Sequence, residues 1–492
     1  MRKTTPHIRL TRRAILAGLA GGATFPAWAD APVRTPRPPR RGAAPSETVT
    51  PVDDLVARSR LEGRVSFVVA DARTGKVLES HEPALTQPPA STAKALTTLY
   101  ALERLGPEHR FATRLLATGP IENGRVMGDL VLAGGGDPTL DTVSLAAMVA
   151  DLKALGVREV GGNLRVWTGA LPNMREIDEE QPRHVAYNPS IGGLNLNFNR
   201  VHFGWERQGT AYQVTMDGRG GSMIPGVRMA RMQVVDRSSP IYTYADGDGR
   251  DDWTVARHAL GASGSRWLPV RYPGLYAGEV LQVVLRAHGI MSGGDIGYAE
   301  TDAGDLLVSH ESAPLDEILT DMLYYSTNAT AEAVGLAASQ AAGDVRDLKG
   351  SAGAMNAWMT RTYGANSADL EDHSGLGDDS RISAADMVRA LVAVGPDGPL
   401  EPLLKPYPVQ DSPNFDVLAK TGTLNFVSAL AGYIDGPGRT PLAFAIFCAD
   451  TARRDTLSVE QRERPPGGQV WLNRARTLQR ALLSRWGNTY TA

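Results

Sequence analysis

The sequence predicts an α/β (α+β) protein in which one antiparallel sheet is assembled from both ends of the chain and covered by helices. Near the start, two apolar segments flank Arg73-Thr74-Gly75, and together they predict a β-hairpin over residues 65–71 and 76–80. Three further strand candidates lie near the end of the chain, at residues 416–421, 427–434 and 442–449.

Helical patterns occupy much of the interval between these strands. The first helix begins near Ser91, where Leu96, Leu99, Leu102 and Leu105 recur at three-residue steps and Gly106 marks the stop. Further helices are expected at residues 278–288, 315–341, 383–394 and 470–486.

Residues 111–270 have a different sequence pattern, in which short runs of alternating apolar and polar residues are separated by Gly and Asn turns. We predict a β-rich insertion over this range, with the main domain formed by residues 51–110 and 271–492. Within it, residues 194–199 alternate strictly and predict a strand that bends at Arg200. A chain of 492 residues exceeds the size of a single hydrophobic core, which agrees with more than one domain.

The first 29 residues have the pattern of a cleaved export signal. Arg12-Arg13 precedes a short apolar run, and Ala27-Trp28-Ala29 is a small-x-small cleavage site. The mature chain is therefore expected to start at Asp30, outside the cytoplasm and without an integral membrane segment. The pattern leaves the twin-arginine and general export routes both open. Residues 30–50, rich in Pro, Arg and Ala, predict a linker.

Composition narrows the classes of partner. A formal net charge of −3 gives no basic surface for nucleic acid. The single cysteine, Cys448, lies in an apolar run, which favours a buried core position over a reactive thiol. No metal or other cofactor is expected, because Arg250 and a missing glycine spoil the only candidate calcium loop, at residues 246–252.

The segment around Ser91 contains the parts of an activated serine nucleophile. Lys94 lies three residues further along the helix, so both side chains share one face. The chain contains only seven lysines against many arginines, and an amine that can lose its proton is the property that distinguishes lysine. Taken alone, Ser91 could equally be a helix cap and Lys94 a solvated surface residue.

Two more motifs complete a pattern. Ser326-Thr327-Asn328 is expected within the helical stretch from Asp316 to about Ala341, and Lys420-Thr421-Gly422 on a strand. A second Ser-x-Asn, at Ser412-Pro413-Asn414, lies in a proline-bounded loop and is rejected.

In this order the three motifs resemble the active-site serine transferases that bind penicillin. Residues 111–140 and the motif Asp372-His373-Ser374-Gly375-Leu376 are similar to those of the D-alanyl-D-alanine carboxypeptidase/endopeptidase family, the low-molecular-mass class C penicillin-binding proteins or S13 peptidases. The chain departs from that family at Thr327, where Asp is common, and at His373, where Gly is usual. The resemblance implies a transpeptidase/β-lactamase-like core with insert domains between the first and second motifs.

The resemblance also implies the roles of the site residues. Ser91 would be the nucleophile, Lys94 its base, and Ser326 the proton shuttle to the leaving amine. Independently of the resemblance, burial and a nearby cation would both lower the pKa of Lys94, and Lys420 is the available cation. Backbone N–H groups of Ser91 and Thr423 would bind the oxyanion. The substrate-binding residues would be Asn328, Thr421, Gly422 and Thr423, with Lys420 also contacting the substrate carboxylate. The expected partners are peptidoglycan stem peptides, with β-lactams as covalent inhibitors.

Other functions remain to be weighed against a DD-peptidase. A β-lactamase or esterase would share the fold, but none of the Leu-Asn pairs carries the Glu of the class A deacylation motif Glu-x-x-Leu-Asn. A non-catalytic wall-binding protein is disfavoured because all three motifs are intact. Oligomeric state and the balance of carboxypeptidase and endopeptidase activity are not predicted.

Overall fold

The computed structural model describes residues 52–343, 345–409 and 414–490. The predicted signal peptide, the predicted linker and residues 410–413, which include most of the rejected Ser-Pro-Asn motif, lie outside the described residues. Among the described residues, no helix is both long enough and apolar enough to cross a membrane.

The central sheet is assembled from both ends of the chain, as predicted, and every pairing within it is antiparallel. In spatial order its strands are β2 (Val77–His81), β1 (Arg64–Asp71), β23 (Leu442–Ala449), β22 (Val427–Asp435), β21 (Asp416–Leu424) and β20 (Lys405–Pro406). Strand β20 covers only one end of β21, so the rest of β21 has a free edge on one side.

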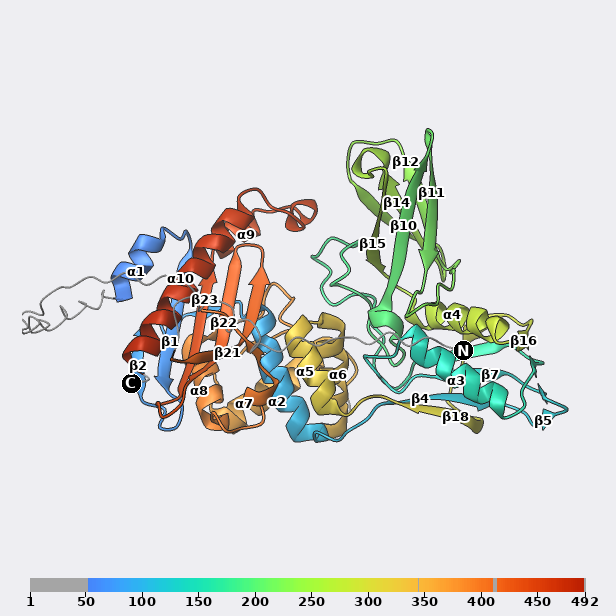
Figure 1. Cartoon of the computed structure of the whole chain (residues 1–492), viewed down its shortest axis with the longest axis horizontal. Coiled ribbons are helices and arrows are strands. Elements are labelled where there is room, and N and C mark those ends of the chain that lie inside the picture. Colours follow the sequence, from blue (N-terminus) through green and yellow to red (C-terminus); the bar gives the residue numbers. More distant parts are fainter. Residues whose placement is uncertain (1–51, 344, 410–413, 491–492) are drawn as a thin grey trace, which may run out of the picture. The chain divides into compact units, whose positions relative to one another are not determined.

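Helices cover both faces of this sheet (Figure 1). Alternate residues of β1 point to opposite sides: Val68 packs with the helical layer, and Phe67 packs with the last helix. The helical layer comprises α2 (Ala93–Leu105), α5 (Leu315–Tyr325), α6 (Asn328–Ala342), α7 (Leu348–Tyr363) and α8 (Ala384–Val394). On the other face lie α10 (Gly468–Thr489) and the short α1 (Val52–Ser59). Cys448 is buried in this second layer, which confirms the core prediction.

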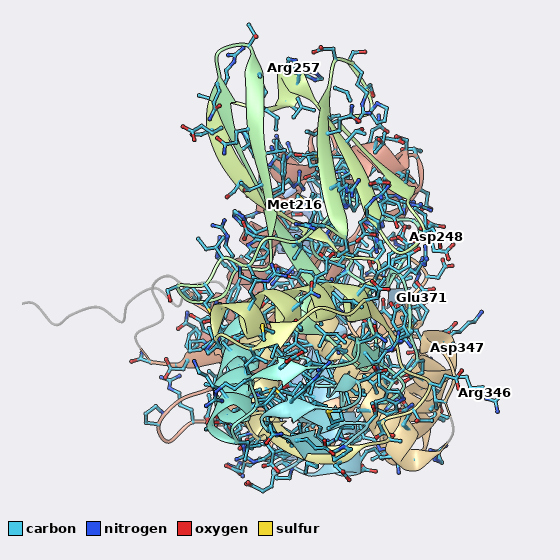
Figure 2. All side chains as sticks on the ribbon, turned by 90° about the vertical axis from the view of Figure 1, so that its right-hand side faces the viewer. Met216, Asp248, Arg257, Arg346, Asp347 and Glu371 are labelled. Atoms are coloured by element: carbon cyan, nitrogen blue, oxygen red, sulfur yellow. The ribbon has the colours of Figure 1, made fainter. Side chains whose placement is uncertain are left out.

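A separate hydrophobic cluster belongs to the predicted insertion. It packs α3 (Thr142–Ala154) and α4 (Pro273–Ala287) against short strands: β4 (Ala112–Ala117), β6 (Arg125–Val126), β7 (Leu130–Ala133), β8 (Glu159–Val160) and β9 (Leu164–Trp167). The exposed β5 (Ile121–Glu122) pairs with β6. Longer strands form two further three-stranded sheets: β10 (Arg200–Gln208), β11 (Ala211–Asp217) and β15 (Ser263–Pro269) in one, and β12 (Ala230–Val235), β13 (Tyr242–Asp246) and β14 (Asp251–Ala256) in the other. Figure 2 shows Arg257, directly after β14, at the far end of these strands.

The C-terminal boundary of this region differs from the prediction. We assigned residues 271–311 to the main domain, but α4 packs in the insertion's cluster, and β16 (Met291–Ser292), β17 (Ile296–Tyr298) and β18 (Asp305–Glu311) pair with β8, β9 and β4. The reason is that these three strands complete open edges left by the earlier ones. The division of the chain into two domains stays a prediction, with its second border near residue 311.

Residues 194–199 are not a strand. Leu196–Asn199 form a 3₁₀ turn in which Asn197, Phe198 and Asn199 have positive φ, and β10 begins only at Arg200. The buried amide of Asn197 donates to Thr142 Oγ1 and Tyr276 Oη, and that of Asn199 to Ser190 O. Asn tolerates left-handed backbone, so the alternation reflects buried amides and not a pleated strand.

Candidate active site

Ser91 lies in a 3₁₀ turn, Ala90–Thr92, that leads directly into α2. Its hydroxyl caps no helix; instead, Oγ accepts a hydrogen bond from Lys94 Nζ at 3.0 Å. Helix α2 continues to Leu105, and Gly106 ends it with a φ of 83°, as the sequence predicted. The one-turn spacing therefore brings the two side chains together as expected.

Lys94 is fully buried, and its amine has three acceptors. Besides Ser91 Oγ, Nζ donates to Asn328 Oδ1 at 2.7 Å and to the backbone oxygen of Ser374 at 2.8 Å. Burial lowers the pKa of Lys94, because removal from water disfavours the ammonium form. The amine is thus oriented toward Ser91 and is easier to deprotonate than a lysine in water.

Two buried carboxyl groups lie behind Lys94. Glu332 accepts from the backbone N–H groups of His373 and Ser374, each at 2.9 Å, directly before the Ser374 carbonyl that accepts from Lys94 Nζ. Asp372 accepts from the backbone N–H groups of Gly375 at 2.5 Å and Gly377 at 2.6 Å. Burial raises the pKa of both carboxyls, and their charge raises the pKa of Lys94 against the effect of burial.

Lys420, on β21, is almost as buried as Lys94, but no carboxylate of the described residues acts on its pKa. Its Nζ donates to Ser326 Oγ and to the backbone oxygen of Thr421, both at 2.8 Å. Burial, followed by the charges of Lys94 and Lys405, lowers the pKa of Lys420 to about 6.

Repulsion between the two amines is one cause of the lowered pKa of Lys420, and the expected role of Lys420 as the cation that helps to keep Lys94 neutral stays a prediction. The causes that act on Lys94 are burial and the charges of Glu332 and Asp372. The pKa of Lys420 is lowered first by burial and then by the like charges of Lys94 and Lys405.

Ser326 stands at a break between two helices, where we predicted one continuous helix. Helix α5 ends at Tyr325, Ser326 adopts the left-handed region with a φ of 60°, and α6 begins at Asn328. Left-handed backbone at a non-glycine residue is strained and persists where the surroundings impose it. The break aims Ser326 Oγ at Lys420 and lets Asn328 reach Lys94.

Asn328 is also held from the insertion. Its Nδ2 donates to the backbone oxygen of Tyr187 at 2.9 Å, while its Oδ1 accepts from Lys94. These two bonds assign the orientation of the amide, and they link residue 187 to the three motifs of the main domain.

Strand β21 passes close to the Ser91 turn. A Cβ on Gly422 would lie 2.7 Å from the backbone oxygen of Pro89 and 3.0 Å from the backbone nitrogen of Ser91. Only glycine leaves the space in front of that N–H open, which is where an oxyanion would have to lie. Thr421 and Thr423, on either side of it, are exposed.

A cleft of about 600 Å³ opens over these residues. Ser91, Ser326, Asn328 and Thr423 line it, with Lys94 and Lys420 behind them. The far wall is formed by Tyr187 and Gln181 of the insertion and by residues after β23, including Arg454 and Arg462. All eight residues predicted for the site thus lie in or beside one cleft, but their roles remain proposals.

Sequence reasoning missed several residues that this arrangement uses. Glu332, Asp372 and the backbone of Ser374 surround Lys94, and Tyr187 holds Asn328. The motif at residues 372–376 supports the family resemblance, but the sequence predicts no role for its individual residues. Glu332 lies one turn after Asn328 on α6, and that spacing could have pointed to it. Within the part of the chain that the structure describes, no group of three or more His, Cys, Asp or Glu could hold a metal ion.

Comparison with known proteins finds relatives of one kind, by sequence and by structure. The D-alanyl-D-alanine carboxypeptidase of Actinomadura sp. (strain R39) is 30% identical over 450 residues, which cover 82% of this chain and 81% of that protein. The crystal structure of penicillin binding protein 4 (dacB) from Haemophilus influenzae matches 88% of this chain and 99% of its own, with a TM-score of 0.70 at 21% identity.

The same Haemophilus influenzae protein has also been solved in complex with a β-lactam, and that structure matches 88% of this chain with a TM-score of 0.67 at 20% identity, covering 99% of its own chain. At this identity the two structures establish the fold. The sequence profile of the D-Ala-D-Ala carboxypeptidase 3 (S13) family matches residues 48–464, which is most of the chain and includes all three motifs. The chain belongs to the D-Ala-D-Ala carboxypeptidase 3 (S13) family.

Proposed function

We propose that this protein is a serine-type DD-peptidase that acts on peptidoglycan through an acyl-enzyme on Ser91. Its substrates are D-Ala-D-Ala termini of stem peptides, D-Ala-containing cross-links, or both. Family membership supports the class of reaction. The observation that carries the proposal is the 3.0 Å contact between Ser91 Oγ and Lys94 Nζ, at a cleft that Ser326 also lines.

In the acylation step, Ser91 Oγ attacks the carbonyl carbon of the penultimate D-Ala and gives its proton to neutral Lys94. A lysine with the reference pKa of about 10.4 would need a shift of about three units, roughly 4 kcal/mol, to be half neutral near pH 7. Burial of Lys94 acts in that direction. The backbone N–H groups of Ser91 and Thr423 would stabilise the oxyanion, a type of contact typically worth a few kcal/mol.

Collapse of the tetrahedral intermediate breaks the C–N bond, and the departing amine must gain a proton. Ser326 is suited to pass it, because its hydroxyl accepts from Lys420 Nζ and lines the cleft. The proton that Lys94 took from Ser91 balances this transfer. Water then hydrolyses the ester, releases the shortened peptide and restores the Ser91 hydroxyl.

Substrate recognition would use the strand and the second motif. An extended peptide can lie along the free edge of β21, where Gly422 permits close approach and Thr421 and Thr423 expose their hydroxyls. Asn328 keeps one N–H and one lone pair beyond those used by Tyr187 and Lys94, so it can bind a substrate amide.

The proposed substrate lies outside the cytoplasm, so we also propose that the chain is exported to the periplasm and cleaved near Ala29. The twin-arginine pattern and the Ala27-Trp28-Ala29 site support this. N-terminal sequencing of protein recovered from the cell envelope should begin at or near Asp30. Recovery of only the uncleaved chain from the cytoplasm would contradict export.

Defined muropeptides test the function itself. Cross-linked and uncross-linked forms are incubated with the mature protein, and mass spectrometry identifies the products. We expect loss of one D-Ala from pentapeptides, opening of D-Ala cross-links, or both, and no reaction with Ser91→Ala. Cleavage at another bond, or equal activity of Ser91→Ala, would refute the proposal.

A further inference from the structure

A second, smaller cavity of about 200 Å³ lies beside strand β21. Thr421 and Thr423 form one side of it, and Arg476 and Arg480 of α10 form the other. Thr423 also lines the active-site cleft, so this cavity adjoins the place where the proposed oxyanion and the bond to be cleaved would lie.

Helix α10 connects the two spaces. Gln469 and Leu472 line the active-site cleft, and Arg476 and Arg480 follow at four-residue steps on the same face of the helix. The helix lies along one face of the central sheet, in red in Figure 1. One stripe of α10 thus lines first the cleft and then the small cavity.

Within residues 52–343, 345–409 and 414–490, no acidic side chain pairs with the two guanidinium groups. Neither Arg476 nor Arg480 forms a salt bridge with any residue that the structure describes, whereas Arg485 on the same helix pairs with Glu79. Tyr407 is a polar neighbour of both arginines. Burial raises the pKa of Tyr407, and the charges of Arg480 and Arg476 lower it. Two like charges one helical turn apart are unfavourable unless an anion lies between them.

The proposed substrate carries an anionic group, and the active site must contain a cation that binds it. The residue that leaves carries a free C-terminal carboxylate, and the sequence suggested Lys420 as its contact. Lys420 is only 1% exposed, and its amine is already used by Ser326 Oγ and Thr421 O. With a pKa of about 6, it also carries little positive charge at neutral pH. The Thr421 and Thr423 hydroxyls are exposed but uncharged.

We propose that Arg476 and Arg480 form the carboxylate-binding site for the leaving residue of the substrate, together with the Thr421 and Thr423 hydroxyls. This inference rests on the proposed function and adds residues to it. Arg476 is half-buried and Arg480 is exposed, and both line the small cavity together with Thr421 and Thr423. A guanidinium pair binds the two oxygens of a carboxylate in parallel, which positions the adjacent amide over Ser91. The carboxylate of a β-lactam would occupy the same place.

The test compares peptides that differ only at the C-terminus. One ends in D-Ala-D-Ala with a free carboxylate, and the other carries a terminal amide; kcat/KM is measured for the wild type, Arg476→Gln, Arg480→Gln and the double variant. For the free carboxylate we expect each single variant to lose about 10- to 100-fold, the usual worth of a charge-assisted hydrogen bond. For the amide we expect no change. Lysine at either position should recover part of the loss.

Arg474→Gln is the matched control, since Arg474 is on the same helix and does not line the cavity. Equal losses for both peptides, or no loss for the carboxylate, would overturn the inference. Thermal unfolding checks each variant, and Arg480→Gln decides the matter if Arg476→Gln proves unstable, because Arg480 is exposed. A wild-type protein that cleaves neither peptide would instead refute the proposed function.

Discussion

The two sides of the active-site cleft bury one lysine each, but in opposite electrostatic surroundings. Lys94, on the helical side, is 0% exposed and faces Glu332 and Asp372. Lys420, on the strand side, is 1% exposed, and the charges that act on it are those of Lys94 and Lys405. Equal burial therefore leaves Lys94 able to take up a proton, while Lys420 is driven toward the neutral amine.

This difference suits the two proposed roles. A base must gain a proton in one step and return it in a later one, so its pKa has to lie near the working pH. Carboxylates behind Lys94 stabilise the protonated form that appears after Ser91 attacks. A neutral Lys420 can both donate to and accept from Ser326, which suits a relay, but it offers little charge to a substrate carboxylate.

The largest effect is expected at Lys94. Lys94→Ala should slow acylation by a labelled penicillin about 10²- to 10⁴-fold, the range for loss of a general base. The change also removes donors to Asn328 and Ser374, so circular dichroism and thermal unfolding must show that the fold is retained. Labelling at the wild-type rate would show that Lys94 is not the base.

A smaller loss is expected on the strand side. Lys420→Ala removes the donor to Ser326 Oγ and should slow acylation about 10- to 100-fold, as for one lost hydrogen bond to a charged or transferring group. Measured under the same conditions as Lys94→Ala, it should be the less impaired variant. The reverse order would mean that the base has been assigned to the wrong side of the cleft.

The smallest expected effect is a shift in the pH dependence of the acylation rate, and it tests the comparison of the two lysines most specifically. Acylation should rise with pH as Lys94 becomes neutral, and the charge of Glu332 raises the pKa of Lys94. Glu332→Gln removes that charge, lowers this pKa and should move the rise in rate to lower pH. Asp137→Asn, which alters a buried carboxyl of the insertion, is the control. A profile that stays in place, or moves to higher pH, would contradict the proposed coupling.

Much of the main domain follows from local pattern. Apolar runs and turn signals predicted the β1–β2 hairpin and the strands β21 to β23. The runs are continuous in β1, β22 and β23 because helices cover both faces of the sheet. The Ser91–Lys94 contact followed from helical spacing alone. Both are short-range features, in which residues close in sequence determine the outcome.

Features that depend on contacts between distant residues were not predicted from the sequence. Glu332 and Asp372 are forty residues apart and meet behind Lys94 only when α6 and the loop after α7 fold together. No glycine or proline stands at Ser326 to predict the break between the two helices. Residues 273–311 return to strands formed more than a hundred residues earlier, and periodicity carries no information about such pairing. The charges around Lys94 and the pairing of the edge strands could therefore be determined only from the structure.

The most direct test of the account is to locate the covalent adduct. The mature protein is treated with a labelled penicillin, digested and mapped by mass spectrometry, alongside Ser91→Ala. The ring-opened ester keeps its leaving group tethered, so the adduct should persist long enough to be isolated. We predict one adduct, on the peptide that contains Ser91, and none on Ser91→Ala. An adduct on another serine, or undiminished labelling of Ser91→Ala, would contradict the assignment of Ser91 as the nucleophile.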